Sequence, residues 1–328
     1  MNPTLRIHSA AVRAIAVSAF TTAIALPAHA LTITPTFGVG VSLAAQTAFN
    51  FAKAEFELAF SDPVIVNIAV AAGTTGLGGS NTSLQFAVPA TYAQARAALL
   101  ADQTAHPSAN GAASFAAGGS VNTTTDPTGG GSFLYSFAQA KALGARAAND
   151  PATDGTFTYN STLTYTFDPN NRQVAGAFDF IGVAEHEISE IMGRIPGLGA
   201  SFCQTCGTDF LVFDLFRYQS NGIRGITNTA GGNYFSINNG TTNLHGFNNA
   251  TLNGGDSQDW DSSQANDPFN AFTGTNQGHA LNAIDFATLD VIGWDLAAAV
   301  PEPGSWALML GGVLGVGLWT RRRLGAAA

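Results

Sequence analysis

The most informative segment of the chain reads Phe178-Asp179-Phe180-Ile181-Gly182-Val183-Ala184-Glu185-His186-Glu187-Ile188-Ser189-Glu190-Ile191-Met192-Gly193-Arg194. It predicts a helix over 178–195 that ends at Pro196-Gly197. At about 100° per residue, one apolar stripe is formed by Ile181, Ala184, Ile188, Ile191 and Ile195. His186 and Glu190 lie nearly opposite this stripe. We therefore expect one face to pack on a core and the other to present an imidazole and a carboxylate.

The segments on either side predict an α+β fold. Helices are expected where apolar residues recur at helical spacing, over 44–60, 91–105, 133–148 and 283–292. β-branched or alternating runs predict strands over 64–70, 156–167, 210–215 and 234–237. Of these, the first is expected to be central and the second to be a hairpin or an edge strand. Gly- and Thr-rich stretches predict loops over 73–83 and 111–131. The order predicts a mixed sheet and a loop-rich C-terminal part.

The two ends of the chain are typical of targeting segments. Residues 1–30 combine basic residues, a short apolar run and a final Ala28-His29-Ala30, which predicts a secretory signal peptide cleaved after Ala30. Residues 298–328 contain Pro301-Glu302-Pro303, a short apolar stretch and three consecutive arginines. About 15 apolar residues rise only about 23 Å, which is short for a bilayer core of about 30 Å. The body of the protein is therefore expected to occupy residues 31–297.

The tail resembles the PEP-CTERM sorting signal of Gram-negative bacteria, over residues 300–323. The resemblance implies export across the inner membrane and transient anchoring by a short transmembrane segment. It also implies recognition by a membrane-bound sorting protease. The final location is then the cell surface or the medium.

The body is strongly acidic and poor in charge of either sign. It contains 8 Lys and Arg (13 minus five in the two ends) and 21 Asp and Glu (22 minus Glu302), a net charge of −13. Such a surface repels phosphate, so nucleic acid is not expected as a partner.

Cys203 and Cys206 are the only cysteines. In an oxidising compartment their spacing favours a small disulfide loop, with a metal-binding pair and a catalytic thiol as alternatives.

Residues His186-Glu187-x-x-Glu190-x-x-Gly193 resemble the metzincin-like motif His-Glu-x-x-His-x-x-Gly. The chain is similar to a family of secreted metalloproteases that often carry PEP-CTERM tails. The resemblance implies a zincin-like domain that hydrolyses peptide bonds in protein or peptide substrates. It also implies that His186 and Glu190 hold Zn²⁺, and that Glu187 acts as general base on water and then as proton donor to the leaving amine.

Three departures from the motif leave the third metal ligand open. Glu190 replaces the second histidine, Pro196 occupies the usual third position, and the body has no methionine after Met192. The remaining candidates for a third ligand are Asp209, Asp214, His245 and His279.

Two other interpretations of the charged residues stay open. Glu190 and Arg194 are spaced i, i+4, with Glu187 nearby, and can form a solvated, salt-bridged helix face. A loop rich in aspartates can hold Ca²⁺ or be a hydrated surface loop: Asp256, Asp259, Asp261 and Asp267. The alternative function is therefore a non-catalytic extracellular or matrix protein on a degenerate zincin fold.

The first prediction concerns the N-terminus of the exported protein. Since the signal ends at Ala28-His29-Ala30, the mature chain should begin near Leu31. Intact-mass analysis of protein from an exporting host measures this directly. An exported species that retains residues 1–30 would contradict the prediction.

Overall fold

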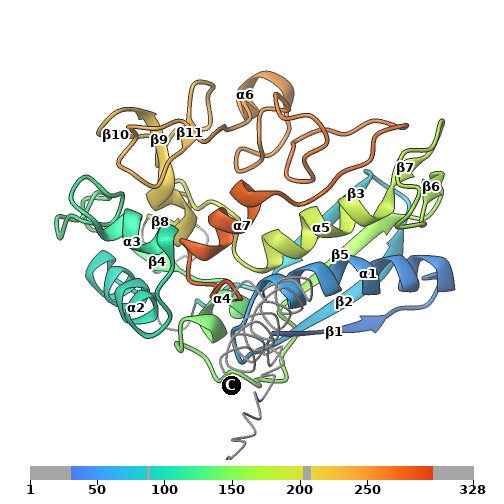
Figure 1. The fold of residues 1–328 in the computed structure, drawn as a ribbon, viewed down its shortest axis with the longest axis horizontal. Coiled ribbons are helices and arrows are strands. Elements are labelled where there is room, and N and C mark those ends of the chain that lie inside the picture. Colours follow the sequence, from blue (N-terminus) through green and yellow to red (C-terminus); the bar gives the residue numbers. More distant parts are fainter. Residues whose placement is uncertain (1–30, 87–88, 202–207, 298–328) are drawn as a thin grey trace, which may run out of the picture.

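A four-stranded mixed sheet organises the computed structural model, which describes residues 31–86, 89–201 and 208–297 (Figure 1). Its strands lie in the order β1 (Thr32–Phe37), β2 (Ile65–Gly73), β5 (Gly155–Asn160) and β3 (Gly78–Thr82). β1, β2 and β5 are parallel, and β3 runs antiparallel to β5 at the edge. The predicted mixture of helices with a mixed sheet is confirmed, and so is the interior position of the strand predicted over 64–70.

Helices α1 (Leu43–Ala59) and α5 (Phe180–Ile191) contact each other and lie along the sheet (Figure 1). α1 begins where the Ser42 side chain accepts a hydrogen bond from the Ala45 amide. Aromatic rings connect the helices to the sheet. Phe49 of α1 stacks on Phe157 of β5 with 5.9 Å between the ring centroids, and the centroid of Phe157 lies 5.8 Å from that of Phe180 of α5. These contacts place α5 in the core, directly above the edge of the sheet.

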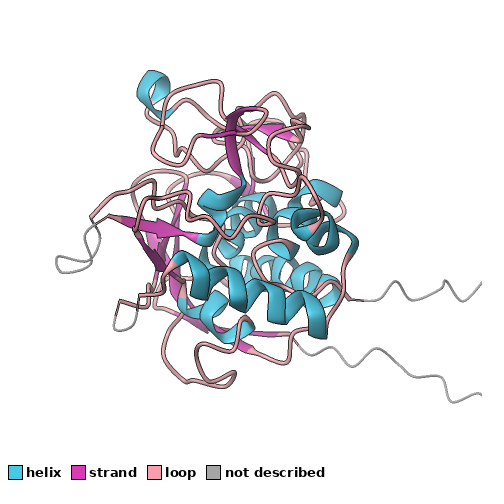
Figure 2. Ribbon diagram, turned by 90° about the vertical axis from the view of Figure 1, so that its left-hand side faces the viewer, coloured by secondary structure: helices cyan, strands magenta, loops and turns pink. Residues whose placement is uncertain are grey.

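The other elements surround this core. Along the sequence, β3 and α5 are separated by β5 and by six further elements. These are α2 (Tyr92–Ala105), α3 (Ala109–Phe115), β4 (Ser132–Leu134), α4 (Phe137–Ala142), β6 (Tyr165–Thr166) and β7 (Phe178–Asp179). The C-terminal part contains β8 (Asp209–Leu211), the 3₁₀ helix η1 (Val212–Phe216), β9 (Arg217–Ser220), β10 (Ile223–Arg224), β11 (Tyr234–Phe235), β12 (His245–Gly246), α6 (Ala250–Asn253) and α7 (Ala283–Asp290). Much of this part is loop, as predicted (Figure 2).

Several expected elements differ in the structure. Part of the loop expected over 73–83 is strand β3, and the strand at 155–160 is interior rather than an edge or a hairpin. The helix expected over 133–148 is strand β4 followed by the short α4, and α3 extends into the loop expected over 111–131. β3 has little intrinsic strand propensity, and its backbone pairs because β5 offers a free edge. Gly78 is required there, since a Cβ would lie 2.5 Å from Val183 Cγ1.

Three predicted features lie outside the described residues. They are the signal at 1–30, the tail at 298–328 and the cysteine pair Cys203 and Cys206.

The last described residues are attached to the loop after α1. The Asp295 carbonyl accepts a hydrogen bond from the Ser61 amide at 2.8 Å, and the Asp295 amide donates to Asp62 Oδ2 at 2.9 Å. His106 Nδ1 lies 2.7 Å from Asp295 Oδ2. Burial, followed by the neighbouring charge of Asp295, raises the pKa of Asp62 to about 8. The folded protein therefore retains a proton on Asp62 that the unfolded chain releases above about pH 4.

The second prediction follows from this retained proton. Because the folded pKa is raised, the stability that Asp62 contributes falls as pH rises from about 4 to about 8. Asp62→Asn imitates the protonated carboxyl, so the variant should gain stability relative to the wild type between pH 5 and pH 8. Urea unfolding at both pH values measures this, with the exposed Asp168→Asn as control. The same pH dependence in wild type and Asp62→Asn would contradict the prediction.

Candidate functional site

Helix α5 is buried on both faces. Asp179 begins it by accepting a hydrogen bond from the Ile181 amide, and Gly193 follows its end with φ +114°, in the left-handed region. Apart from His186, every residue of α5 is buried. Loops of the C-terminal part therefore cover the polar face of α5, and His186 and Glu187 of this face line a cavity beneath them. The site lies between the helix and these loops.

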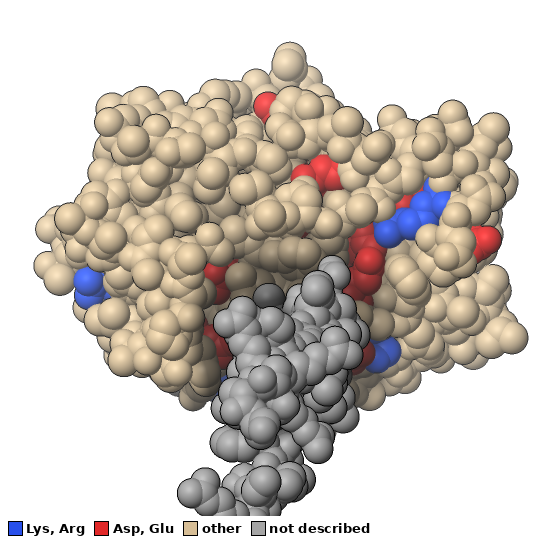
Figure 3. All heavy atoms as spheres, viewed as in Figure 1, with Lys and Arg blue, Asp and Glu red and all other residues tan. Residues whose placement is uncertain are grey.

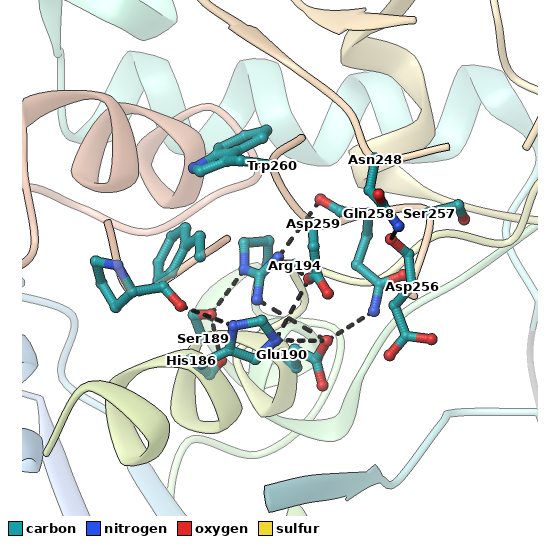
Figure 4. Close-up of polar contacts among 12 residues, drawn as sticks. His186, Ser189, Glu190, Arg194, Asn248, Asp256, Ser257, Gln258, Asp259 and Trp260 are labelled. Atoms are coloured by element: carbon teal, nitrogen blue, oxygen red, sulfur yellow. Dashed lines mark hydrogen bonds and ion pairs between the residues drawn. The ribbon is translucent and has the colours of Figure 1, made fainter. Parts of the chain in front are cut away.

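Three side chains bring possible metal-donor atoms together at this interface (Figure 4). His186 Nε2 lies 3.5 Å from Glu190 Oε1 and 3.4 Å from Asp259 Oδ1. Donor atoms in a tetrahedral zinc site, at about 2.0–2.2 Å from the ion, lie about 3.3–3.6 Å from one another. The separations between His186 and the two carboxylates therefore match the spacing that a small divalent cation requires.

Each of these donors is oriented by a further contact. His186 Nδ1 lies 2.8 Å from the Pro268 carbonyl, which can only accept, so Nδ1 carries a proton and Nε2 faces the carboxylates. The Glu190 carboxylate accepts from Ser80 of β3 at 2.6 Å and from Gln258 at 2.7 Å. A carboxylate oxygen has two lone pairs, so these bonds leave acceptor capacity toward His186.

Arg194 neutralises part of the negative charge. Its guanidinium is fully buried and donates to Asp259 Oδ1 at 2.8 Å, and it lies 3.8 Å from Glu190 Oε1. The interpretation as a solvated salt-bridged face is therefore corrected, because the ion pair with Glu190 is present but buried.

The charges in this cluster shift one another's ionisation. Burial opposes the charged form of His186, but Asp259 and Glu190 outweigh it and raise the His186 pKa to about 10. Burial raises the pKa of Asp259 to about 6, against the charges of His186 and Arg194. For Glu190, burial is outweighed by His186 and Arg194, which lower its pKa. With no metal, the cluster is neutral overall, with two cations and two anions.

Glu187 lies on the wall of a cavity next to this cluster. The cavity has a volume of about 300 Å³, and its lining includes Leu77, Gly78, His186, Glu187, Asp259 and His279. The whole Glu187 residue is 6% exposed, and its Oε2 is buried with no hydrogen-bond partner among the described residues. Burial and the neighbouring Glu190 raise the Glu187 pKa well above its usual range. Glu187 is thus a protonatable carboxyl that faces an accessible space.

Within the described residues, none of the four candidates for the third ligand belongs to this group of donor atoms. Asp214 Oδ2 accepts hydrogen bonds from the backbone amides of Gly197, Leu198 and Leu211, so this carboxylate holds the surrounding backbone together. Asp209 is buried at the start of β8. His245 packs edge-on against Trp260, and His279 lines the cavity without joining the donor group. Among the described residues, the carboxylate grouped with His186 and Glu190 is that of Asp259.

The four aspartates considered for Ca²⁺ have different partners. Asp259 faces His186 and Arg194, Asp261 accepts from Ser263, and Asp267 accepts from Asn282. Asp256 lines the cavity. From the sequence, Asp259 was considered only as one of the aspartates of this loop. No pattern in the sequence predicts its contact with α5, because Asp259 lies 69 positions after Glu190.

The face in Figure 3 carries few charged side chains, in keeping with the low charge of the body. Within the described residues, no helix is both long enough and apolar enough to cross a bilayer.

Comparison with known proteins identifies one segment. Residues 299–323 match the PEP-CTERM protein-sorting motif, which confirms the predicted sorting signal. No curated protein and no solved structure matches the chain. The motif indicates an exported protein that is sorted through its C-terminus to the cell envelope or surface.

Proposed function

We propose that residues 31–297 form one zincin-like domain that acts as a zinc-dependent endopeptidase. The observation that supports this most is the grouping of His186, Glu190 and Asp259 around a shared space, beside Glu187 on the cavity wall. A partner of the tail would be a membrane sorting protease, and the substrates would be proteins or peptides outside the cytoplasm.

The chain offers one imidazole and two carboxylates for a cation. His186, Glu190 and Asp259 would hold it, with Pro268, Ser80, Gln258 and Arg194 keeping these donors in place. Three protein ligands leave a fourth position for water or substrate, as in catalytic zinc sites. A zinc ion bound there supplies Lewis acidity that polarises a carbonyl and acidifies water.

Glu187 would transfer the proton. Its raised pKa favours the protonated form, and a cation bound nearby lowers the pKa of a carboxyl and so favours its ionised form. Glu187 can then take a proton from the attacking water and deliver it to the leaving amine. Its Oε2 is buried and accepts no hydrogen bond from the described residues, so a lone pair remains for the proton.

The edge strand β3 supports a peptide as the substrate. β3 is one of the two edge strands of the sheet, and Leu77 and Gly78 line the cavity. An extended peptide can pair with the free backbone groups of such an edge. This would lay a peptide bond along the wall that carries Glu187.

One observation favours the alternative of a non-catalytic envelope or matrix protein. Arg194 and the protonated His186 already neutralise Glu190 and Asp259 with no metal. A cluster whose charges balance in this way needs no metal ion. In this alternative its function is to join the C-terminal loops to α5. Metal content distinguishes the two functions.

The third prediction is therefore about zinc. The purified body should bind about one zinc per chain, more tightly at pH 8 than at pH 6, since zinc must displace the His186 proton. Asp259→Asn should lose most of this zinc, while its amide oxygen can still accept from Arg194. Asp261→Asn, two residues away in the same loop, is the matched control and should keep its zinc. Elemental analysis measures all three, and a metal-free wild type after refolding with zinc would leave the matrix-protein alternative.

The fourth prediction separates the general base from the ligands. Glu187→Gln should keep zinc but lose cleavage of an unstructured protein by about 10²-fold or more, since only the proton acceptor is removed. Glu185→Gln changes a carboxyl on the same helix that contacts Arg172 and does not line the cavity, so cleavage should remain. Rates measured with and without chelator test this. Equal rates for Glu187→Gln and wild type would exclude the proposed role.

A further inference from the structure

His279 is a second imidazole on the wall of the cavity. It is 6% exposed and lies over the first turn of α5, where Gly182 makes room for it. A Cβ at Gly182 would lie 2.8 Å from His279 Cβ and 2.9 Å from its Nδ1. The side chain therefore occupies space that the helix keeps open, one turn before His186.

The ring of His279 lies beside the Asp179 carboxylate, and its Nδ1 makes no hydrogen bond within the described residues. His279 Nδ1 lies 3.5 Å from Asp179 Oδ2, and the same oxygen accepts from the His279 amide at 2.9 Å and from Arg172 Nε at 2.8 Å. Burial opposes ionisation of Asp179, but the contacts with His279 and the Arg172 charge outweigh it and lower the Asp179 pKa. An anionic Asp179 beside Nδ1 favours the tautomer with the proton on Nδ1. Nε2 then offers a lone pair.

The lone pair on Nε2 has an exchangeable partner. Thr273 Oγ1 lies 2.9 Å from His279 Nε2, so the threonine hydroxyl donates to it. The same hydroxyl lies 3.3 Å from Gln277 Oε1 and can turn to donate there instead. Another donor can therefore replace Thr273 without leaving its hydroxyl unpaired.

We infer that His279 is a substrate-binding residue, whose Nε2 accepts a hydrogen bond from a backbone N–H of a peptide lying in the cavity. The inference rests on the proposed endopeptidase function, because it assigns this wall to the same substrate. Every peptide residue except proline offers such a donor. This hydrogen bond holds the bound peptide on one side of the peptide bond that is cleaved. No proton is transferred through it. His279 thus acts in binding, whereas Glu187 acts in chemistry.

Binding of fluorescein-labelled β-casein, an unstructured protein, to Glu187→Gln protein tests this without turnover. Adding His279→Leu removes the acceptor and should weaken binding about tenfold, the effect of one hydrogen bond. Adding His279→Gln keeps an acceptor oxygen and should weaken it less than about threefold. His245→Leu is the matched control, a buried histidine that does not line the cavity, and should leave the Kd unchanged.

The binding experiment distinguishes failure of this inference from failure of the proposed function. A Kd for His279→Leu equal to that of the Glu187→Gln parent, or no binding by that parent, would overturn the inference. Equal weakening by His279→Leu and His279→Gln, with a matching loss of Tm, would also overturn it, since that marks a structural role. Absence of zinc or of cleavage in the wild type would instead count against the proposed function, and the binding comparison can still be made in metal-free protein.

Discussion

The buried ion pair between Arg194 and Asp259 is the contact on which the site depends. Arg194 follows α5, Asp259 belongs to the C-terminal loops, and their atoms meet at 2.8 Å with no exposure of the guanidinium. The Phe269 ring lies over the same guanidinium, with Cζ 4.3 Å from its centroid. Removing one partner of such a pair leaves a buried charge, which typically costs about 3–5 kcal/mol. The pair therefore keeps the loops closed over the helix.

This closure determines the electrostatics of the neighbouring groups. Asp259 reaches His186 because Arg194 holds it there, and the two carboxylates then favour a cation between them, whether a proton on the imidazole or a metal ion. The same closure removes water from Glu187, whose pKa rises as a result. Packing and ionisation are thus consequences of a single arrangement.

Two glycines keep the space around the site open. Gly78 lets the edge strand approach Val183 and Glu187, and Gly182 leaves room for His279. Side chains at these positions would push β3 or the C-terminal loop away from α5. Glu190 is held from both sides, since Ser80 and Gln258 each donate a hydrogen bond to its carboxylate.

The sequence alone determined what depends on neighbouring residues. Helical spacing predicted α1, α2, α5 and α7, and the i, i+4 spacing of His186 and Glu190 placed them on one face, because a helix repeats every 3.6 residues. The tail motif was equally local. Tertiary structure decided the rest. β3 forms only because β5 offers an edge, and Asp259 joins the site only because a buried Arg194 needs an anion. Both features depend on which distant segments come together in the core, where an unpaired charge or backbone group is strongly unfavourable. A local sequence pattern does not show which distant segments will be in contact.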